Sequence, residues 1–350
     1  MVMNVKGYAA LAVKEDLVPH NFVRRDPRED DVVIDILYSG VCHSDIHNAY
    51  NDWGGAKYPM VPGHEIIGRV VHVGKSVTKF KVGDLAGVGC MVDSCQHCSA
   101  CEQGLEQYCE EGNTLTYNDI DRNDGLPTFG GYSDKIVVTE KFVVKVPEGI
   151  DLRGAAPLLC AGITTWSPLR HWQVGEGSKV AVVGLGGLGH MAIKFANALG
   201  AEVTLFTRSP GKEADARRLG ASHVVLSTDN EQMKATANQF DLIIDTVPYV
   251  HDLNPYIPTL ALSGTLVLVG YLGALDPFLN TVPLILGRRS VAGSVIGGIA
   301  ETQEMMDFCG QHGITADVEV IDIQDINRAW QRMLKSDVKY RFVIDIASLK

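Results

Sequence analysis

Four cysteines in one short stretch are the residues whose types and spacing most directly indicate chemistry. Cys95, Cys98, Cys101 and Cys109 follow the pattern C-x2-C-x2-C-x7-C. Four thiolates from one loop can surround a single ion, as a closed structural zinc site requires. The same opening begins the iron–sulfur run of bacterial ferredoxins, but that run continues x3-C-P, whereas here the last gap is seven residues and Glu110 follows. The spacing therefore favours zinc over an iron–sulfur cluster or unrelated surface thiols.

A second signal is a glycine-rich turn between the apolar run 180–183 and a segment expected to be helical. The pattern G-x-G-x-x-G spans Gly184, Leu185, Gly186, Gly187, Leu188 and Gly189. Such glycines permit a tight turn and close approach to a pyrophosphate, and the helix N-terminus supplies free N–H groups. The alternative is a purely structural glycine turn. Because the turn lies between a strand and a helix, a dinucleotide site is the better interpretation.

The segment about 20 residues farther on indicates which dinucleotide is bound. An NAD-binding protein carries Asp or Glu there for the ribose 2′-hydroxyl, but this chain has Thr207, Arg208, Ser209 and Lys212. Hydroxyl groups and cations suit a 2′-phosphate. A solvated basic turn is the alternative, since Arg and Lys are common on surfaces. We expect NADP(H).

Two further cysteines and a histidine form a candidate second metal site. Cys42 lies in Gly-Val-Cys-His-Ser-Asp, His64 follows a Pro-Gly turn, and Cys160 lies in Leu-Cys-Ala-Gly-Ile-Thr. Two cysteines and one histidine hold the open zinc site of alcohol dehydrogenase, which keeps a position for water or substrate. Each alone has a simpler explanation as a packing residue or hydrogen-bonded core histidine. Cys90 and Cys309 are interpreted as packing residues.

Composition limits the class of protein. The 350 residues indicate about two domains. A net charge of −11 argues against a surface for nucleic acid or anionic lipid, and no run approaches the ~18 apolar residues of a membrane span. The N-terminus lacks a cationic start and an evident cleavage site, so we expect the eight cysteines to be thiols and metal ligands in a reducing cytoplasm.

The elements that must position these residues follow two patterns. Residues 30–150 contain short β-rich runs separated by Gly and Pro, which predict a mostly antiparallel β domain with the metal loop as an insertion. From about residue 179, strands alternate with helices, which predicts a parallel doubly wound sheet. After residue 297, a helical run and two strand-like runs leave this alternation, and we expect them to return to the first domain.

Together these segments resemble the zinc-dependent medium-chain alcohol dehydrogenases, and within them the cinnamyl alcohol dehydrogenase-like, NADP-dependent aldehyde reductases. The resemblance covers nearly the whole chain, including Tyr-Arg-Phe-Val-Ile-Asp near its end. It implies an α/β protein with a GroES-like, mostly β catalytic domain at 1–155 and 297–350, including a structural zinc lobe at about 90–112. It also implies a Rossmann NADP-binding domain at 156–296, two zinc ions per chain, a site in the cleft between the domains, and often a homodimer through the Rossmann sheets.

The resemblance implies roles for individual residues. Cys42, His64 and Cys160 would hold the catalytic zinc, which stabilises charge on the aldehyde oxygen while NADPH delivers hydride. Ser44 would pass a proton toward the cofactor ribose and His47, and a histidine can exchange protons with solvent near neutral pH. The expected substrates are primary alcohols and aldehydes of aromatic or medium-chain type.

Further roles concern residues next to these ligands. Asp45 would accept a hydrogen bond from the ligand histidine, with an ordinary turn Asp as the alternative. Glu65 would bind zinc transiently during ligand exchange. Arg341 would reach the pyrophosphate or pair with Glu65, unless it is a surface strand residue, and Thr164 would contact the cofactor. His43 stands where many family members have an Arg near the pyrophosphate.

Two rival functions remain open at this point. A zinc-free quinone or enone reductase would have the glycine fingerprint without either metal site, and a nonenzymatic redox sensor would use the cysteines as a switch. The seven metal-ligand candidates, together with Ser44 and His47, favour an enzyme. Trp53 and Tyr117 are expected either to line an apolar substrate cavity or to pack in a core.

Overall fold

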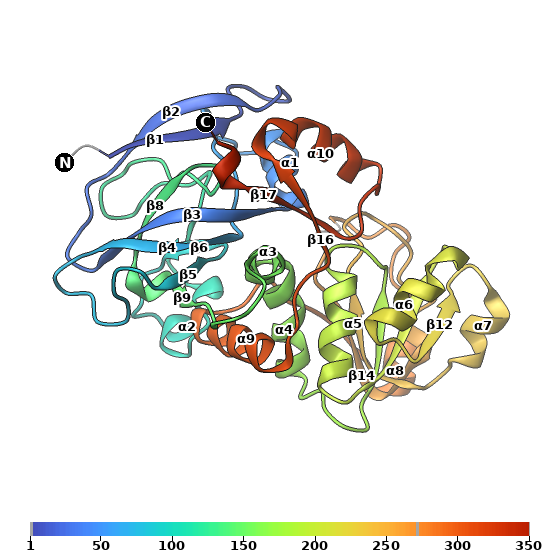
Figure 1. Ribbon diagram of the computed structural model, residues 1–350. Coiled ribbons are helices and arrows are strands. Elements are labelled where there is room, and N and C mark those ends of the chain that lie inside the picture. Colours follow the sequence, from blue (N-terminus) through green and yellow to red (C-terminus); the bar gives the residue numbers. More distant parts are fainter. Residues whose placement is uncertain (1–2, 271–272, 350) are drawn as a thin grey trace. The chain divides into compact units, whose positions relative to one another are not determined.

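The computed structural model describes residues 3–270 and 273–349, and the chain forms two compact units (Figure 1). The first unit contains Met1–Ile163 and Gly297–Lys350, and the second contains Thr164–Ile296. The first unit thus continues past residue 155, where we placed the boundary, and includes Cys160. The physical reason is that the 3-10 turn η3 (Ala156–Leu159) packs against strands of the first unit.

A mostly antiparallel sheet organises the first unit, in agreement with the predicted β domain. Its described strands run in the order β16-β17-β3-β4-β5-β9. Strand β8 pairs with the first half of β3, and β17 pairs with the second half. Among the described strands of this sheet, only β16 and β17 are parallel to each other, and β17 attaches the C-terminal segment to β3. The strands are β3 (Asp31–Val41), β4 (Ile66–Val73), β5 (Leu85–Val88), β8 (Lys135–Thr139), β9 (Val144–Lys145), β16 (Val318–Asp322) and β17 (Arg341–Asp345).

Smaller elements complete this unit. Strands β1 (Met3–Ala9) and β2 (Val18–Arg24) form one hairpin, and β6 (Met91–Asp93) pairs with β7 (Thr114–Leu115) beside the cysteine loop. The helices are α1 (His43–Ala49), α2 (Ser99–Glu102), α3 (Leu152–Ala155), α9 (Ile299–His312) and α10 (Ile326–Leu334). Helix α4 (Ala161–His171) begins in the first unit and ends in the second. The other 3-10 turns are η1 (Glu106–Tyr108), η2 (Glu140–Phe142), η6 (Ile323–Asp325) and η7 (Ile346–Ser348).

Helix α10 shows why these helices pack as they do. Its buried residues Ile326, Ala329, Trp330 and Met333 recur at the spacing of one helical face. Arg332, at the side of this face, pairs with Glu319 of β16. Within residues 3–270 and 273–349, no helix is both long and apolar enough to cross a membrane.

The second unit contains the predicted doubly wound sheet. Its described strands are all parallel and run in the order β12-β11-β10-β13-β14-β15, which is 3-2-1-4-5-6 when β10 is counted as the first. The elements are β10 (Lys179–Val183), α5 (Gly189–Ala198), β11 (Glu202–Thr207), η4 (Pro210–Lys212), α6 (Glu213–Leu219), β12 (His223–Leu226), α7 (Asn230–Ala235), β13 (Phe240–Asp245), η5 (Ile257–Thr259), β14 (Leu260–Leu268), α8 (Val282–Gly287) and β15 (Ser290–Gly293).

The parallel arrangement places chemistry at one edge of this sheet. Strand β10 is apolar and buried over Val180–Val183, as expected for a strand covered on both faces. Because parallel strands end at the same edge, Gly184, Thr207 and Asp245 lie at the carboxyl ends of three neighbouring strands. Ligands of doubly wound sheets bind at this edge, where the strand order reverses.

Candidate metal centres and dinucleotide site

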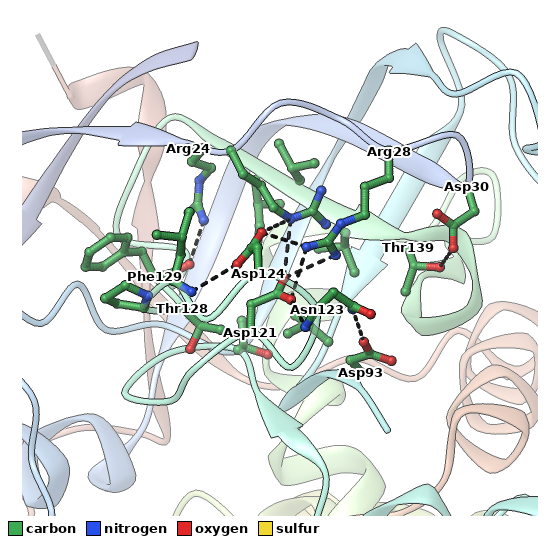
Figure 2. A pocket seen from close by; sticks show the side chains of 18 of the residues that line it. Arg24, Arg28, Asp30, Asp93, Asp121, Asn123, Asp124, Thr128, Phe129 and Thr139 are labelled. Atoms are coloured by element: carbon green, nitrogen blue, oxygen red, sulfur yellow. Dashed lines mark hydrogen bonds and ion pairs between the residues drawn. The ribbon is translucent and has the colours of Figure 1, made fainter. Parts of the chain in front are cut away.

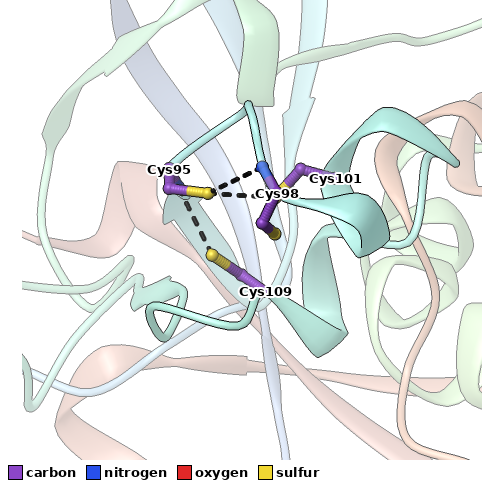
Figure 3. Close-up of side chains that lie close together, drawn as sticks. All are labelled: Cys95, Cys98, Cys101 and Cys109. Carbon is purple, nitrogen blue, oxygen red and sulfur yellow. Dashed lines mark hydrogen bonds between the residues drawn. The ribbon is translucent and has the colours of Figure 1, made fainter.

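The four cysteines of the loop converge on one point. The thiol sulfurs of Cys95, Cys98, Cys101 and Cys109 all lie within 4.8 Å of one another (Figure 3). Backbone N–H groups already point at sulfur: Cys98 N lies 3.3 Å from Cys95 Sγ, and Glu110 N lies 3.4 Å from Cys98 Sγ. Hydrogen bonds from backbone N–H groups lower the pKa of Cys98 to about 6. This arrangement fits zinc, which binds thiolates rather than thiols.

A second group of metal-binding side chains forms from three distant segments. One donor atom from each of Cys42, His64, Glu65 and Cys160 lies within 4.8 Å of the others, and all four residues are buried. Cys42 caps α1, His64 and Glu65 precede β4, and Cys160 follows η3. The two thiols lie 4.0 Å apart, and their hydrogen bond lowers the pKa of Cys42 well below its usual range. Two sulfurs, an imidazole and a carboxylate fit zinc.

Asp45 lies beneath this group and is completely buried. Its Oδ1 is 3.2 Å from His64 Nδ1 and accepts from Gly63 N at 3.1 Å, while its Oδ2 accepts from Cys42 N at 2.9 Å and from the Tyr132 hydroxyl at 3.0 Å. With Nδ1 of His64 donating to Asp45, the ring's Nε2 is left with the lone pair that a metal needs. The structure therefore brings together the predicted Asp45 and His64.

Glu65 and Arg341 form a buried ion pair. Arg341 Nη2 donates to Glu65 Oε1, whereas Glu65 Oε2 has no hydrogen-bond partner among the described residues. Arg341 is 5% exposed, so it is not the surface residue that was one alternative. Burial raises the pKa of Glu65, whereas the charge of Arg341 lowers it and favours the ionised carboxylate. An orphaned buried oxygen beside three metal-ligating groups fits a carboxylate that binds an ion.

Gly40 determines how closely this carboxylate can pack. Its N–H donates to the Glu65 carbonyl at 2.8 Å, and a Cβ on Gly40 would lie 1.9 Å from Glu65 Oε2. Only glycine leaves that volume free.

The predicted proton-relay residues lie on α1. Ser44 Oγ is 3.6 Å from Cys42 Sγ. His47 is partly exposed, and its Nδ1 lies 2.9 Å from Asp52 Oδ2. Ser44 is thus next to the metal-ligating group and His47 next to solvent, while the predicted link between them is the ribose of NADP(H).

The two aromatic residues differ in their surroundings. Trp53 is 44% exposed and lies against the ring of His47, with centroids 5.2 Å apart. Tyr117 is buried and stacks on the ring of His64 at 5.7 Å, and its hydroxyl accepts from Asn48 at 3.1 Å. Tyr117 therefore supports the histidine ring.

The glycine fingerprint has the geometry of a dinucleotide turn. Gly184 has φ +90°, and a Cβ on Gly189 would lie 2.1 Å from the Gly184 carbonyl oxygen. A Cβ on Gly186, by contrast, would meet no atom within 4 Å, so its backbone faces open space. Gly187 and Leu188 complete the turn into α5.

The basic turn after β11 connects to this fingerprint. Lys212 Nζ donates to the Leu185 carbonyl at 3.0 Å, and burial lowers the pKa of Lys212. Thr207 is buried and its hydroxyl accepts from Ser209 N at 3.2 Å, while Arg208 is exposed. The structure therefore brings the predicted cofactor residues of this turn to the carboxyl edge of the sheet. Thr164, also predicted at the cofactor, is buried in α4.

Thr246 is a supporting residue of the fingerprint that sequence reasoning missed. Its hydroxyl donates to the Val183 carbonyl at 2.8 Å and lies 3.2 Å from where a Cβ on either Gly184 or Gly189 would be. The available signal was a small polar residue directly after the apolar strand 240–245.

The glycine contacts predict different effects for two similar substitutions. Gly186→Ala should leave the free energy of unfolding unchanged but weaken NADPH binding about tenfold or more, because the methyl occupies the space that a pyrophosphate approaches. Gly189→Ala should also destabilise the protein by about 1–3 kcal/mol, because its methyl collides with backbone. Urea unfolding and NADPH titration measure both, and equal stability of the two variants would contradict the prediction.

One cavity of the first unit, of about 270 Å³, contains none of the predicted site residues (Figure 2). Its charged groups pair with one another: Arg28 Nη2 lies 2.6 Å from Asp124 Oδ2 and 3.1 Å from Asp121 Oδ1, and Arg25 pairs with Asp31. Because these side chains form ion pairs with one another, we interpret the cluster as structural: it joins Arg28 to Asp121 and Asp124 of the 119–129 loop.

Comparison with known proteins agrees with this geometry. Residues 28–148 match the family model described as alcohol dehydrogenase GroES-like domain, and residues 187–311 match zinc-binding dehydrogenase. The chain belongs to the zinc-dependent alcohol dehydrogenase family. The zinc-free reductase and the nonenzymatic sensor are thereby set aside, and the cofactors of this alcohol dehydrogenase are zinc and NADP(H).

Individual relatives cover nearly the whole chain. A probable formaldehyde dehydrogenase of Bacillus subtilis is 54% identical over 326 residues, 93% of each chain. An NADP-dependent alcohol dehydrogenase C of Mycolicibacterium smegmatis is 52% identical over 347 residues, 99% of each chain. The solved structure of a cinnamyl alcohol dehydrogenase from Sorghum bicolor matches with a TM-score of 0.95 and 47% identity over 99% of each chain. Like its family, this alcohol dehydrogenase interconverts alcohols and aldehydes.

Proposed function

We propose that this alcohol dehydrogenase acts at a zinc ion held by Cys42, His64 and Cys160, with Glu65 as a transient fourth ligand. The observation that carries the proposal is the convergence of these four buried donors, one of which keeps an oxygen without a hydrogen bond. A second, structural zinc ion is bound by the four-cysteine loop, whose four sulfurs leave no position for substrate.

The residues around the catalytic ion have separate roles. When bound, zinc supplies Lewis-acid stabilisation of charge on the substrate oxygen, and NADPH supplies hydride. Asp45 orients the His64 ring, and Arg341 holds one oxygen of Glu65. Ser44, next to Cys42, hands on the proton, and His47, bonded to Asp52 at the surface, exchanges it with solvent.

Aromatic and medium-chain primary alcohols and aldehydes are the proposed substrates. The likeness to a cinnamyl alcohol dehydrogenase structure supports this class, whereas the Bacillus relative is named for formaldehyde. The test measures NADPH oxidation with cinnamaldehyde, benzaldehyde, hexanal and formaldehyde, alongside zinc analysis. Two zinc ions per chain and the highest kcat/KM for cinnamaldehyde or benzaldehyde are expected. One ion per chain would contradict the metal sites, and a preference for formaldehyde would contradict the substrate class.

The cofactor preference is proposed to depend on the turn Thr207–Lys212. Arg208→Ala should raise the KM for NADPH about tenfold or more and leave the KM for NADH unchanged, since a charge-assisted bond contributes ~1.5–3 kcal/mol. Arg217→Ala is the matched control, because this exposed arginine of α6 pairs with Glu213 instead. An equal change for both cofactors in Arg208→Ala would contradict a 2′-phosphate contact.

A homodimer through the Rossmann sheets is proposed as the functional assembly. Among the described residues, β15 pairs only with β14 and is an edge strand. In the segment between β14 and β15, Phe278, Ile285 and Leu286 are 90%, 76% and 81% exposed, and large exposed apolar side chains are typical of an interaction site. Leu286→Glu should halve the mass measured by sedimentation; an unchanged mass would contradict this interface.

The cytoplasm is the proposed location. This proposal rests on the eight cysteines of the sequence, which suit thiols and metal ligands in a reducing compartment better than disulfides. We propose no nucleic-acid or membrane partner, in line with the net charge of −11. Cell fractionation that recovers the protein outside the cytoplasm would contradict the location.

A further inference from the structure

Tyr132 lies beneath the proposed metal centre without being one of its ligands. Its side chain is fully buried, and its hydroxyl donates to Asp45 Oδ2 at 3.0 Å. The two residues are far apart in the sequence, and the contact joins the turn 129–135 to Asp45 on α1. Burying a tyrosine hydroxyl is costly unless it is hydrogen-bonded, so this bond matters for the position of both groups.

The Tyr132 bond completes an ordered set around Asp45. Oδ2 takes the Tyr132 hydroxyl and the Cys42 N–H, while Oδ1 takes the Gly63 N–H and lies against His64 Nδ1. Two contacts on each oxygen fix the rotation of the carboxylate. Without the hydroxyl, Oδ2 loses one of its two contacts, and the carboxylate is held less firmly in the rotation that meets the His64 ring.

Backbone contacts hold Tyr132 itself in place. Segment 130–132 forms backbone hydrogen bonds with segment 61–63, which directly precedes His64. In one of them, the N–H of Tyr132 donates to the Pro62 carbonyl at 2.9 Å. Gly63 has φ +102°, and a Cβ there would lie 2.7 Å from Tyr132 Cδ1. The aromatic ring is therefore wedged against the turn that carries the ligand histidine.

Arg24 of β2 binds the same turn, and we call this contact the Arg24 clamp. Its guanidinium is buried and donates to the carbonyls of Phe129, Gly130 and Lys135 at 2.8, 3.0 and 2.6 Å, and to Ser133 Oγ at 3.1 Å. Figure 2 shows Arg24 beside Phe129. Burial lowers the pKa of Arg24 to about 9, so the group remains protonated at neutral pH. Four bonds from one rigid fork determine where the turn can lie.

From these contacts we propose that Tyr132 is a positioning residue of the catalytic metal centre: its hydroxyl, placed by the Arg24 clamp on turn 129–135, orients Asp45 and thereby the ring of His64. The inference rests on the proposed ligand set Cys42, His64 and Cys160. The competing explanation is that Tyr132 only fills the core.

Zinc release separates the two explanations. Tyr132→Phe removes only the hydroxyl, and Tyr256→Phe is the matched control, a buried tyrosine of the second unit whose hydroxyl bonds Ser227. With a chromogenic chelator in excess, Tyr132→Phe should lose one of its two zinc ions about tenfold faster than wild type, since such outer partners contribute 10–100-fold to metal affinity. The other ion, and both ions of Tyr256→Phe, should leave at wild-type rates. Wild-type rates for both ions of Tyr132→Phe would overturn the proposal.

A spectrum tests orientation without relying on rates. With Co²⁺ in place of zinc in the catalytic centre, the visible absorption should shift in Tyr132→Phe and stay unchanged in Tyr256→Phe. Identical spectra would mean that the hydroxyl does not orient the ligands, which would overturn the inference while leaving the proposed function intact. A wild-type protein that holds only the ion of the cysteine loop would overturn both.

Discussion

Replacing Cys160 with alanine is expected to abolish turnover while leaving the fold largely intact. Cys160 contributes one of the three donors of the proposed catalytic site, and we expect the remaining thiol and imidazole to hold zinc weakly. A Lewis-acid metal contributes several kcal/mol to catalysis, and each 1.36 kcal/mol is tenfold in rate, so kcat should fall by about 10³-fold or more. Steady-state kinetics with NADPH and an aldehyde measure the loss, and zinc analysis should show one ion per chain.

Cys309→Ala provides the control for this experiment. Cys309 is also a fully buried thiol, but it lies on α9 and belongs to none of the groups of metal-binding side chains among the described residues. It should keep two zinc ions and most of its activity. If Cys160→Ala kept more than a tenth of the wild-type kcat, the proposed assignment of the catalytic site would be wrong.

Replacing Cys98 with serine is expected to destabilise the protein, in contrast to Cys160→Ala. Metal binding to a structural site is coupled to folding and contributes ~10–16 kcal/mol in zinc-finger peptides, so losing one ligand should lower the free energy of unfolding by about 3 kcal/mol or more. Thermal unfolding and zinc analysis measure the effect, and a wild-type protein treated with a strong chelator should move in the same direction.

His97→Ala is the control in the same loop. The His97 ring is exposed, bonds the Cys95 carbonyl at 2.7 Å and lies 2.8 Å from Glu111, so its loss leaves the four sulfurs in place. Its melting temperature should stay close to that of wild type. An unchanged melting temperature and two bound zinc ions in Cys98→Ser would show that this loop is not a structural zinc site.

The local features of this protein could be predicted because their residues are close in the sequence. The cysteine loop spans residues 95–109, and the glycine fingerprint spans 184–189, so spacing alone restricts how each can fold. The two-domain α/β architecture also follows from the sequence, because antiparallel and parallel sheets impose different patterns of apolar residues and turns.

The boundary between the units could not be placed in this way. It was predicted at residue 155, but the first unit continues to Ile163. The turn Ala156–Leu159 is apolar and would suit either core; its packing against β3, β4 and β5 decides the matter.

Sequence by itself thus determined the fold class, the family and the residue types available for zinc and NADP(H). Tertiary structure decided the partnerships: Arg341 with Glu65 across 276 residues, Tyr132 with Asp45 across 87, and Arg24 with the turn 129–135. The physical reason is that a buried polar group needs a hydrogen-bond partner, and the fold can supply that partner from any distance along the chain. Such a pair produces no repeating pattern of residues from which it could be predicted.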